Sequence, residues 1–114
     1  LRRIEPNERF FIPSGIKANV PDGYALIAMN KSGVALKKGL IVGACVVDSD
    51  YQGEIHLHLI NTTHKAVTIE PGEKLTQFLL IPVDHCDVTV VEEEQLFTEE
   101  TTRGSGGFGS TGVK

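Results

Sequence analysis

Residues 54–61 read Glu-Ile-His-Leu-His-Leu-Ile-Asn, and this stretch decides the fold class. Every second side chain from Ile55 to Leu59 is apolar, whereas His56 and His58 point the other way along an extended chain. This alternation predicts a half-buried β-strand. Two histidines at this spacing could bind a metal ion from one strand face, but no third ligand stands near them in the sequence. A solvated or interface face is the ordinary interpretation.

Similar short apolar or alternating runs recur along the chain, separated by turn residues such as Pro21-Asp22-Gly23 and Pro71-Gly72-Glu73. Residues 34–39 fit a single helical turn. About eight short strands predict an all-β domain, either a small distorted barrel or a jelly roll. Besides residues 54–61, the expected strands are Arg9–Pro13, Ile16–Val20, Tyr24–Met29, Leu40–Val47, Ala66–Glu70, Leu75–Val83 and Val88–Val91.

The composition of the 114 residues narrows the function classes. The formal net charge of -4 gives no broad basic field, so nucleic acid is not an expected partner. No apolar stretch approaches the roughly 18 residues of a membrane span, so no membrane association is expected. Cys45 and Cys86 are too few for a disulfide framework and fit a reducing, cytosolic setting.

The composition changes sharply from Glu99 onward, where glycine, serine and threonine dominate. Such a segment cannot build a core, so we expect residues 1–98 to form the β domain and residues 99–114 to form a flexible arm. Glycines let successive backbone N–H groups converge on phosphate oxygens, and Arg103 adds a bidentate cation. Phe108 is unusual among glycines and could stack on a base. A plain flexible linker is the alternative.

Residues 103–112, Arg-Gly-Ser-Gly-Gly-Phe-Gly-Ser-Thr-Gly, resemble the C-terminal motif of the trimeric dUTPase family. The resemblance implies a dUTPase-like β-clip fold and a tail that closes over bound nucleotide. In that closed tail, Arg103 would hold the γ-phosphate and Phe108 would cover the uracil. The remaining phosphate contacts would come from Gly109, Ser110 and Thr111.

The segment Val46-Val47-Asp48-Ser49-Asp50-Tyr51-Gln52-Gly53-Glu54 resembles the third motif of the family. By resemblance, Asp48 would orient and deprotonate the attacking water, and Tyr51 would pack under the deoxyribose and exclude a 2′-hydroxyl. The preceding hairpin, including Val42, Val46 and Val47, would read the uracil edge through its backbone. Taken alone, this stretch is a strand followed by a solvated acidic turn.

Two further segments resemble phosphate-binding motifs of the family. Lys31-Ser32-Gly33 aligns with the second motif, although Asn30-Lys31 stands where Pro-Arg is usual and lysine lacks the planar fork of arginine. Ser32 would donate to the oxygen that bridges the α- and β-phosphates. Residues 71–77 match the fourth motif, and Gln77 would contact a phosphate or orient Ser32.

The first motif of the family, an Ala-Gly-x-Asp-Leu segment, has no counterpart, and Leu1 aligns just downstream of it. Either the missing strand lies upstream in the parent protein, or this copy is defective. The resemblance thus covers four of five motifs.

The family resemblance implies hydrolysis of dUTP to dUMP and pyrophosphate by water attack at the α-phosphorus. It implies Mg²⁺ held through the triphosphate and waters rather than by protein ligands, and a homotrimer with active sites shared between subunits. It also implies a cytoplasmic location, or the host-cell cytosol for a virus-encoded protein. A dCTP deaminase-related enzyme and a non-catalytic nucleotide-binding trimeric β module are the alternatives.

Overall fold

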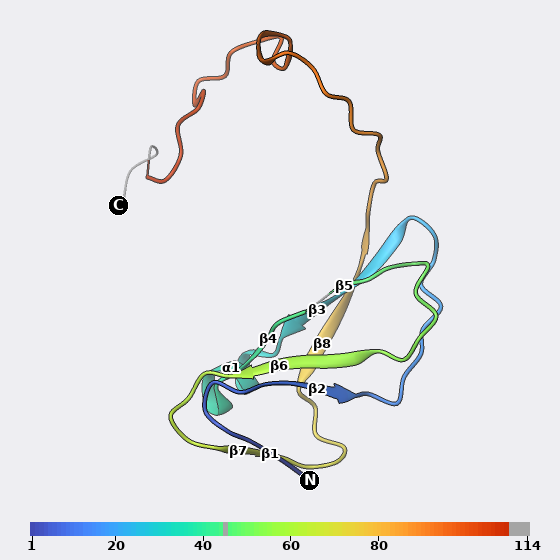
Figure 1. Ribbon diagram of the computed structural model, residues 1–114, viewed down its shortest axis with the longest axis vertical. Helices are drawn as coiled ribbons and strands as arrows, with labels where there is room; N and C mark the ends of the chain where they lie inside the picture. Colours follow the sequence, from blue (N-terminus) through green and yellow to red (C-terminus); the bar gives the residue numbers. More distant parts are fainter. Residues whose placement is uncertain (45, 110–114) are drawn as a thin grey trace.

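The computed structural model describes residues 1–44 and 46–109 and contains three small antiparallel sheets and one short helix (Figure 1). The predicted all-β fold is confirmed, and the helical turn expected over residues 34–39 is a longer helix, α1 (Ser32–Lys38). The strands are β1 (Arg2–Ile4), β2 (Arg9–Pro13), β3 (Tyr24–Asn30), β4 (Leu40–Val42), β5 (Val46–Val47), β6 (His56–Asn61), β7 (Val67–Ile69) and β8 (Thr76–Pro82). A 3₁₀ turn covers Glu93–Gln95.

Strand β6 is the centre of the main sheet, whose order is β2-β6-β4. Its central residue, Leu59, pairs with Phe10 of β2 and with Val42 of β4. Leu59 is fully buried whereas His56 is exposed, so the two faces predicted for this strand are confirmed. The buried side chains that pack into one core are Ile4, Phe10, Leu40, Leu59, Ile69 and Leu75.

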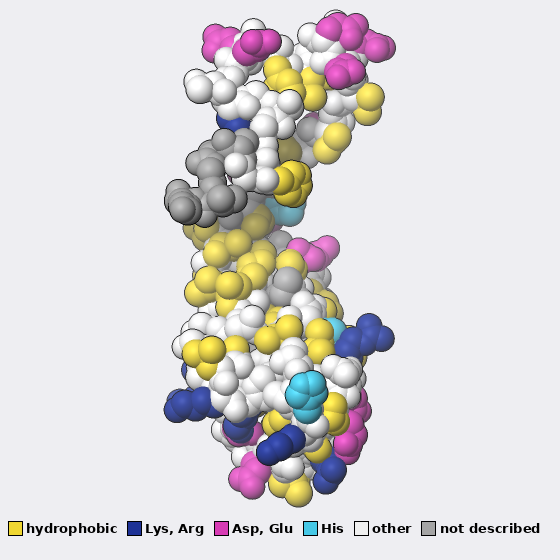
Figure 2. Space-filling view, turned by 90° about the vertical axis from the view of Figure 1, so that its left-hand side faces the viewer, with side chains coloured by type: hydrophobic (Ala, Val, Ile, Leu, Met, Phe, Trp, Pro, Cys, Tyr) yellow, Lys and Arg dark blue, Asp and Glu magenta, His cyan; other side chains and the backbone are white. Residues whose placement is uncertain are grey.

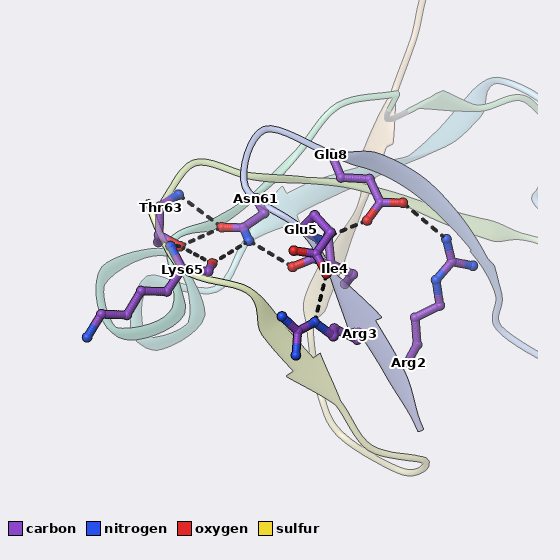
Figure 3. A network of polar contacts seen from close by, with 8 residues as sticks. All are labelled: Arg2, Arg3, Ile4, Glu5, Glu8, Asn61, Thr63 and Lys65. Carbon is purple, nitrogen blue, oxygen red and sulfur yellow. Dashed lines mark hydrogen bonds and ion pairs between the residues drawn. The ribbon is translucent and has the colours of Figure 1, made fainter.

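Asn61, at the end of β6, links this sheet by hydrogen bonds to β1 and to the turn that follows β6 (Figure 3). Among the described residues it is the one buried polar side chain. Its Nδ2 donates to the carbonyl oxygens of Ile4, at 3.1 Å, and Lys65, at 2.9 Å. Its Oδ1 accepts hydrogen bonds from the backbone N–H and the hydroxyl of Thr63, at 2.9 and 2.8 Å. Both ends of the amide are therefore satisfied, and β1 is held against the turn that follows β6.

Helix α1 is short, and Gly39 sets where it ends. Gly39 adopts the left-handed conformation, with φ 66°, and its N–H caps the helix by donating to the Ala35 carbonyl. A Cβ atom at Gly39 would lie 2.2 Å from Cγ2 of Thr63. Glycine is therefore required here both for its backbone freedom and for the space it leaves. Lys38, in the last turn, forms an ion pair with Glu73.

The third sheet has the order β5-β3-β8, and β3 and β8 pair along seven residues. Part of its apolar surface is not covered by the other described residues: Met29, Leu79 and Leu80 are 42%, 49% and 52% exposed. Figure 2 shows apolar side chains gathered across the middle of the molecule. This surface is available to a further layer of protein.

After Val83 the chain leaves the sheets and extends away from them in a wide arc (Figure 1). From here on, the arm means the described residues 84–109, in place of the residues 99–114 expected from composition. Residues 1–44 and 46–83 are called the body. The Cα radius of gyration is 19.6 Å, whereas a compact chain of this length has about 13 Å. The arm accounts for this difference, because it extends away from the sheets, which all lie in the body.

Three sequence predictions need correction, and one strand was missed. Residues 40–47 do not form one strand, because β4 and β5 belong to different sheets. Residues 16–20 are irregular, since only isolated bonds such as Ile55 N–H to the Ile16 carbonyl, at 2.9 Å, hold them to the body. Residues 88–91 form no strand, because no neighbouring strand in the chain pairs with them. Strand β1 was not predicted.

Candidate active site

The chain crosses from one sheet to another between Val42 and Val46, and this crossing shapes the site. The Val42 N–H donates to Oδ1 of Asn30 at 2.7 Å. The Gly43 N–H donates to the His58 carbonyl at 2.9 Å, and the Ala44 N–H donates to Nδ1 of His58 at 2.7 Å. Three successive backbone donors are therefore already bound by protein acceptors.

A hollow of about 550 Å³ opens beside the crossing. Three of the four body residues predicted to contact base and sugar line it, namely Val46, Val47 and Tyr51. The fourth, Val42, is not part of the lining. Asp48 follows Val47 directly and is exposed. The other lining residues are Phe11, Ala28, Ala44, Glu54, Ile55, His56 and Phe78.

Tyr51 is held by the turn in which it lies. Its hydroxyl donates to the Glu54 carbonyl at 2.6 Å, and its N–H donates to the Asp48 carbonyl at 3.1 Å. A Cβ atom at Gly53 would lie 2.6 Å from the Tyr51 hydroxyl oxygen and 2.7 Å from the adjacent ring carbon. The tyrosine ring thus rests on a backbone segment that admits it only because residue 53 is glycine.

The predicted phosphate-binding residues of the body lie around the start of α1. Lys31 immediately precedes the helix, and Ser32 and Gly33, both exposed, begin it. Nε2 of Gln77 on β8 donates to the Asn30 carbonyl at 3.0 Å. The structure therefore brings Gln77 beside the Lys31–Gly33 segment, which is predicted to bind phosphate at the same site.

Lys31 lines a different hollow from Tyr51. This second hollow, of about 690 Å³, lies against residues 69–76 and residues 11–14. Phe11, Ile55 and Phe78 line both hollows, but Val46, Val47 and Tyr51 line only the first. Within one chain, the residues predicted to hold base and sugar and the lysine predicted to hold phosphate thus face different spaces.

Arg103, Phe108 and Gly109 lie in the arm, and no described arm residue lines either hollow. Nε of Arg103 donates to the Gly106 carbonyl at 2.6 Å. Phe108 has a positive φ of 51° and is fully exposed. Ser110 and Thr111 lie outside the described residues. The body of a single chain and its own arm therefore do not assemble the predicted site.

The two histidines of β6 show no metal-binding arrangement. In residues 1–44 and 46–109, no three His, Cys, Asp or Glu side chains gather closely enough to hold an ion. Instead, both histidine rings lie near the Phe11 ring, whose centroid is 4.8 Å from that of His58 and 6.5 Å from that of His56. None of the described helices is both long and apolar enough to cross a bilayer.

Sequence reasoning did not identify Asn30, Gly53 or His58 as parts of this site. The sequence did contain an indication for Gly53, because this glycine lies two residues after Tyr51 in the acidic turn. The alternation of β6 showed His58 on a polar face but could not show what the ring contacts. Asn30 was noticed only as a departure from the usual proline.

The dUTPase family model matches residues 2–112 of this chain. A deoxyuridine 5′-triphosphate nucleotidohydrolase of Chlamydia pneumoniae is 47% identical over 110 residues, which are 95% of this chain and 74% of that protein. The structural match to a mutant dUTPase of Staphylococcus bacteriophage 80alpha, described as solved with dUpNHpp, has a TM-score of 0.85. It covers 98% of this chain and 80% of that one, at 24% identity.

A second structural match is to a mutant dUTPase from phage phi11 of S. aureus, described as coordinating a structural Mg(II) ion. Its TM-score is 0.69 at 20% identity, and the match covers 81% of this chain and 77% of that one. These structures confirm the dUTPase-like fold, and the sequence matches extend over nearly the whole chain. This chain therefore belongs to the dUTPase family, the deoxyuridine 5′-triphosphate nucleotidohydrolases.

Proposed function

We propose that this enzyme converts dUTP to dUMP and pyrophosphate by attack of water on the α-phosphorus, with Asp48 as the general base. The observation that carries this proposal is the position of Asp48. It directly follows Val47 at the hollow lined by Val46, Val47 and Tyr51, and its side chain is exposed to solvent. A base in this place can reach a water molecule at the mouth of the hollow and accept its proton.

The hollow beside the crossing would hold the nucleoside. Its volume of about 550 Å³ is in the range of small-molecule sites. Val46 and Val47 would present backbone groups to the uracil edge, and Tyr51 would pack under the deoxyribose, leaving no room for a 2′-hydroxyl. Because Asn30 already accepts the Val42 N–H, Val42 would contribute its carbonyl or side chain rather than its amide proton.

The triphosphate would be held by two groups of residues. Lys31, Ser32, Gly33 and Gln77 lie on the body, where Gln77 is bonded to the Asn30 carbonyl next to Lys31. The arm would bring Arg103 to the γ-phosphate and Phe108 over the uracil, with further phosphate contacts from Gly109, Ser110 and Thr111. Ser32 would stabilise charge on the departing pyrophosphate by hydrogen bonding.

The donor set of this site fits Mg²⁺ held through the substrate. Magnesium ions keep several waters and bind through one or two carboxylates and substrate phosphates rather than in all-protein cages. Glu54 lines the hollow, and Asp48 and Asp50 are exposed in the turn that follows β5. We propose that no protein atom binds the ion directly; when bound, it would neutralise charge on the phosphates.

We also propose that the active sites are shared within a homotrimer. Three features of one chain support this: Tyr51 and Lys31 line different hollows, the arm extends away from both, and β3 and β8 leave apolar surface exposed. In a threefold assembly, one subunit would give the crossing, a second the phosphate-binding residues and the third the arm.

Replacing Asp48 with asparagine tests the catalytic proposal. The amide keeps the size of the carboxylate but accepts no proton at neutral pH, so turnover should fall by about 10²–10⁴ while KM stays within a few-fold. Pyrophosphate release from dUTP measures both. Asp50→Asn, in the same turn, is the matched control and should retain turnover. Near-normal turnover in Asp48→Asn would remove this residue from the role of base.

Mixing two inactive variants tests the shared site. Asp48→Asn chains and chains that lack residues 103–114 would be unfolded together, refolded and assayed. Mixed trimers contain sites in which an intact Asp48 meets an intact arm from another chain, so activity should reappear. A mixture that stays as inactive as its components would contradict sharing.

A further inference from the structure

The ring of His58 is placed at the crossing between β4 and β5. His58 lies on β6, where its strand neighbours Leu57 and Leu59 face the core, and its own side chain is half-buried on the opposite face. The ring meets the Phe11 ring on one side, at a centroid distance of 4.8 Å and an interplanar angle of 38°. Its Nδ1 faces the crossing, 2.7 Å from the Ala44 nitrogen.

His58 and residue 43 compete for the same space. A Cβ atom built on Gly43 would lie 1.9 Å from Nδ1 and 2.2 Å from Cε1 of His58. These atoms belong to a ring whose position is fixed by Phe11 and by the Ala44 bond, so no side chain fits at position 43 unless the ring moves. Gly43 does not require a positive φ, so its need for glycine comes from the histidine.

The hydrogen bond to Ala44 fixes the tautomer of the neutral ring. A backbone N–H is a donor, so Nδ1 must offer its lone pair, and the proton of the neutral imidazole must be on Nε2. The His58 carbonyl also accepts the Gly43 N–H at 2.9 Å. One residue therefore binds two successive amides of the crossing, one through its backbone and one through its side chain.

We infer that His58 is a positioning residue for the base, because it holds the crossing in the shape that lets Val46 and Val47 face the hollow. The inference rests on the proposed function in one respect, namely that residues 42–47 read the uracil. His58 itself lines neither hollow and touches no reacting atom. Its effect should therefore appear in the binding of dUTP and not in the chemical step.

Two substitutions at His58 separate its hydrogen bond from its bulk. His58→Leu keeps a side chain in contact with Phe11 but removes the acceptor for the Ala44 N–H. Loss of one neutral hydrogen bond should raise KM for dUTP by about fivefold and leave kcat within twofold. His58→Asn places Oδ1 where Nδ1 stood, so it should restore most of the KM. His64→Leu, on the exposed turn after β6, is the matched control and should change neither constant.

Hydrogen exchange measured by NMR on the same proteins reads the crossing directly. The Ala44 amide should exchange slowly in the parent and in His58→Asn, and at least tenfold faster in His58→Leu. A long-range ¹H–¹⁵N spectrum of the parent should show an unprotonated Nδ1 on His58. Slow exchange of Ala44 in His58→Leu, or a protonated Nδ1, would overturn the inference whatever the kinetics show.

The two measurements also distinguish the inference from the proposal on which it rests. Fast exchange with a raised KM supports both. Fast exchange with an unchanged KM would show that His58 holds the crossing but that the crossing does not read the base, which overturns His58 as a positioning residue for the base. A fall in kcat with unchanged KM would likewise contradict it, because the effect would then lie in the chemical step.

Discussion

The body and the arm use apolar side chains in opposite ways. In the body, Ile4, Leu40 and Leu59 are at most 1% exposed and pack into one core. In the arm, Val88 and Val90 are more than 90% exposed, and further along the exposed Phe97 and Phe108 have no cover. Figure 2 shows acidic side chains gathered at the top of the view, where the arm is farthest from the body, whereas most of the basic side chains lie on the body.

The two regions therefore differ in how much apolar surface each one buries within the described chain. Burial of apolar surface stabilises a chain by about 25 cal/mol per Å², and the body obtains this stabilisation from its own strands. The described residues of the arm obtain little of it, because their apolar side chains are mostly exposed, although residues 88–91 have the composition of a strand. Under the proposed sharing of active sites, its order would come from a second subunit or from bound nucleotide, whereas the body should fold in the absence of either.

Among the tests of this comparison, deletion of residues 103–114 should give the largest effect, because it separates folding from activity. The truncated chain keeps the entire body, so its circular dichroism and melting temperature should match those of the parent. Hydrolysis of dUTP should fall by about 10²–10³, since phosphate contacts made in the transition state are lost. Full activity of the truncated protein would show that this segment is only a linker.

The Asn61→Ala variant probes the opposite region. It removes the donor to the Ile4 and Lys65 carbonyls and leaves buried groups unpaired, so the free energy of unfolding should fall by about 2–3 kcal/mol. Urea denaturation followed by fluorescence or circular dichroism measures this loss. Asn19→Ala, at an exposed position, should change stability by less than about 0.5 kcal/mol. Equal stability of the two variants would mean that the Asn61 network does not hold the body together.

The Tyr51→Ala variant tests whether the body alone selects the sugar. Removal of the ring opens space for a 2′-hydroxyl, so the ratio of kcat/KM for dUTP over UTP should drop by about twentyfold. Gly53→Ala should give part of this effect, because its Cβ would displace the tyrosine hydroxyl. Unchanged discrimination in Tyr51→Ala would rule out the steric role.

The Phe108→Ala variant should give the smallest effect. Loss of one stacking ring should raise KM for dUTP by about fivefold, without the larger loss of turnover expected from the full deletion. Protease cleavage of the arm, with and without a non-hydrolysable dUTP analogue and Mg²⁺, provides the structural readout. The analogue should protect the parent arm more than that of Phe108→Ala. Equal protection would show that the Phe108 ring does not stack on the base.

The sequence predicted those parts of the fold that depend on local pattern. Strand β2 was predicted with its observed bounds from a short apolar run that ends at the turn residues Ser14-Gly15, and β6 was predicted with its correct faces from alternation. Residues 40–47 were predicted as one strand because their break depends on Asn30 and His58, which lie 12 and 14 residues from their hydrogen-bond partners. Residues 88–91 have the composition of a strand, but pairing needs a neighbour that one chain does not supply.

The candidate site likewise contains parts that the sequence predicted and parts that it did not. The acidic turn and the glycine-rich segment stood out by composition, whereas the contacts that fix Tyr51 and the crossing are long-range or depend on side-chain size. Asn61 gave no signal, because an asparagine at the end of a strand usually faces solvent. Only the fold shows that the carbonyls of Ile4 and Lys65 converge on it.

The hydrogen bond from the Val42 N–H to Asn30 makes these two positions epistatic. A proline at position 30, the residue usual in this motif, has no side-chain acceptor, so it would leave the Val42 amide without its partner. A change at Asn30 should therefore be tolerated only together with a change in the crossing that gives the Val42 N–H another acceptor. Transplanting residues 42–46 into a relative that keeps the proline would transfer an unmet backbone donor along with them.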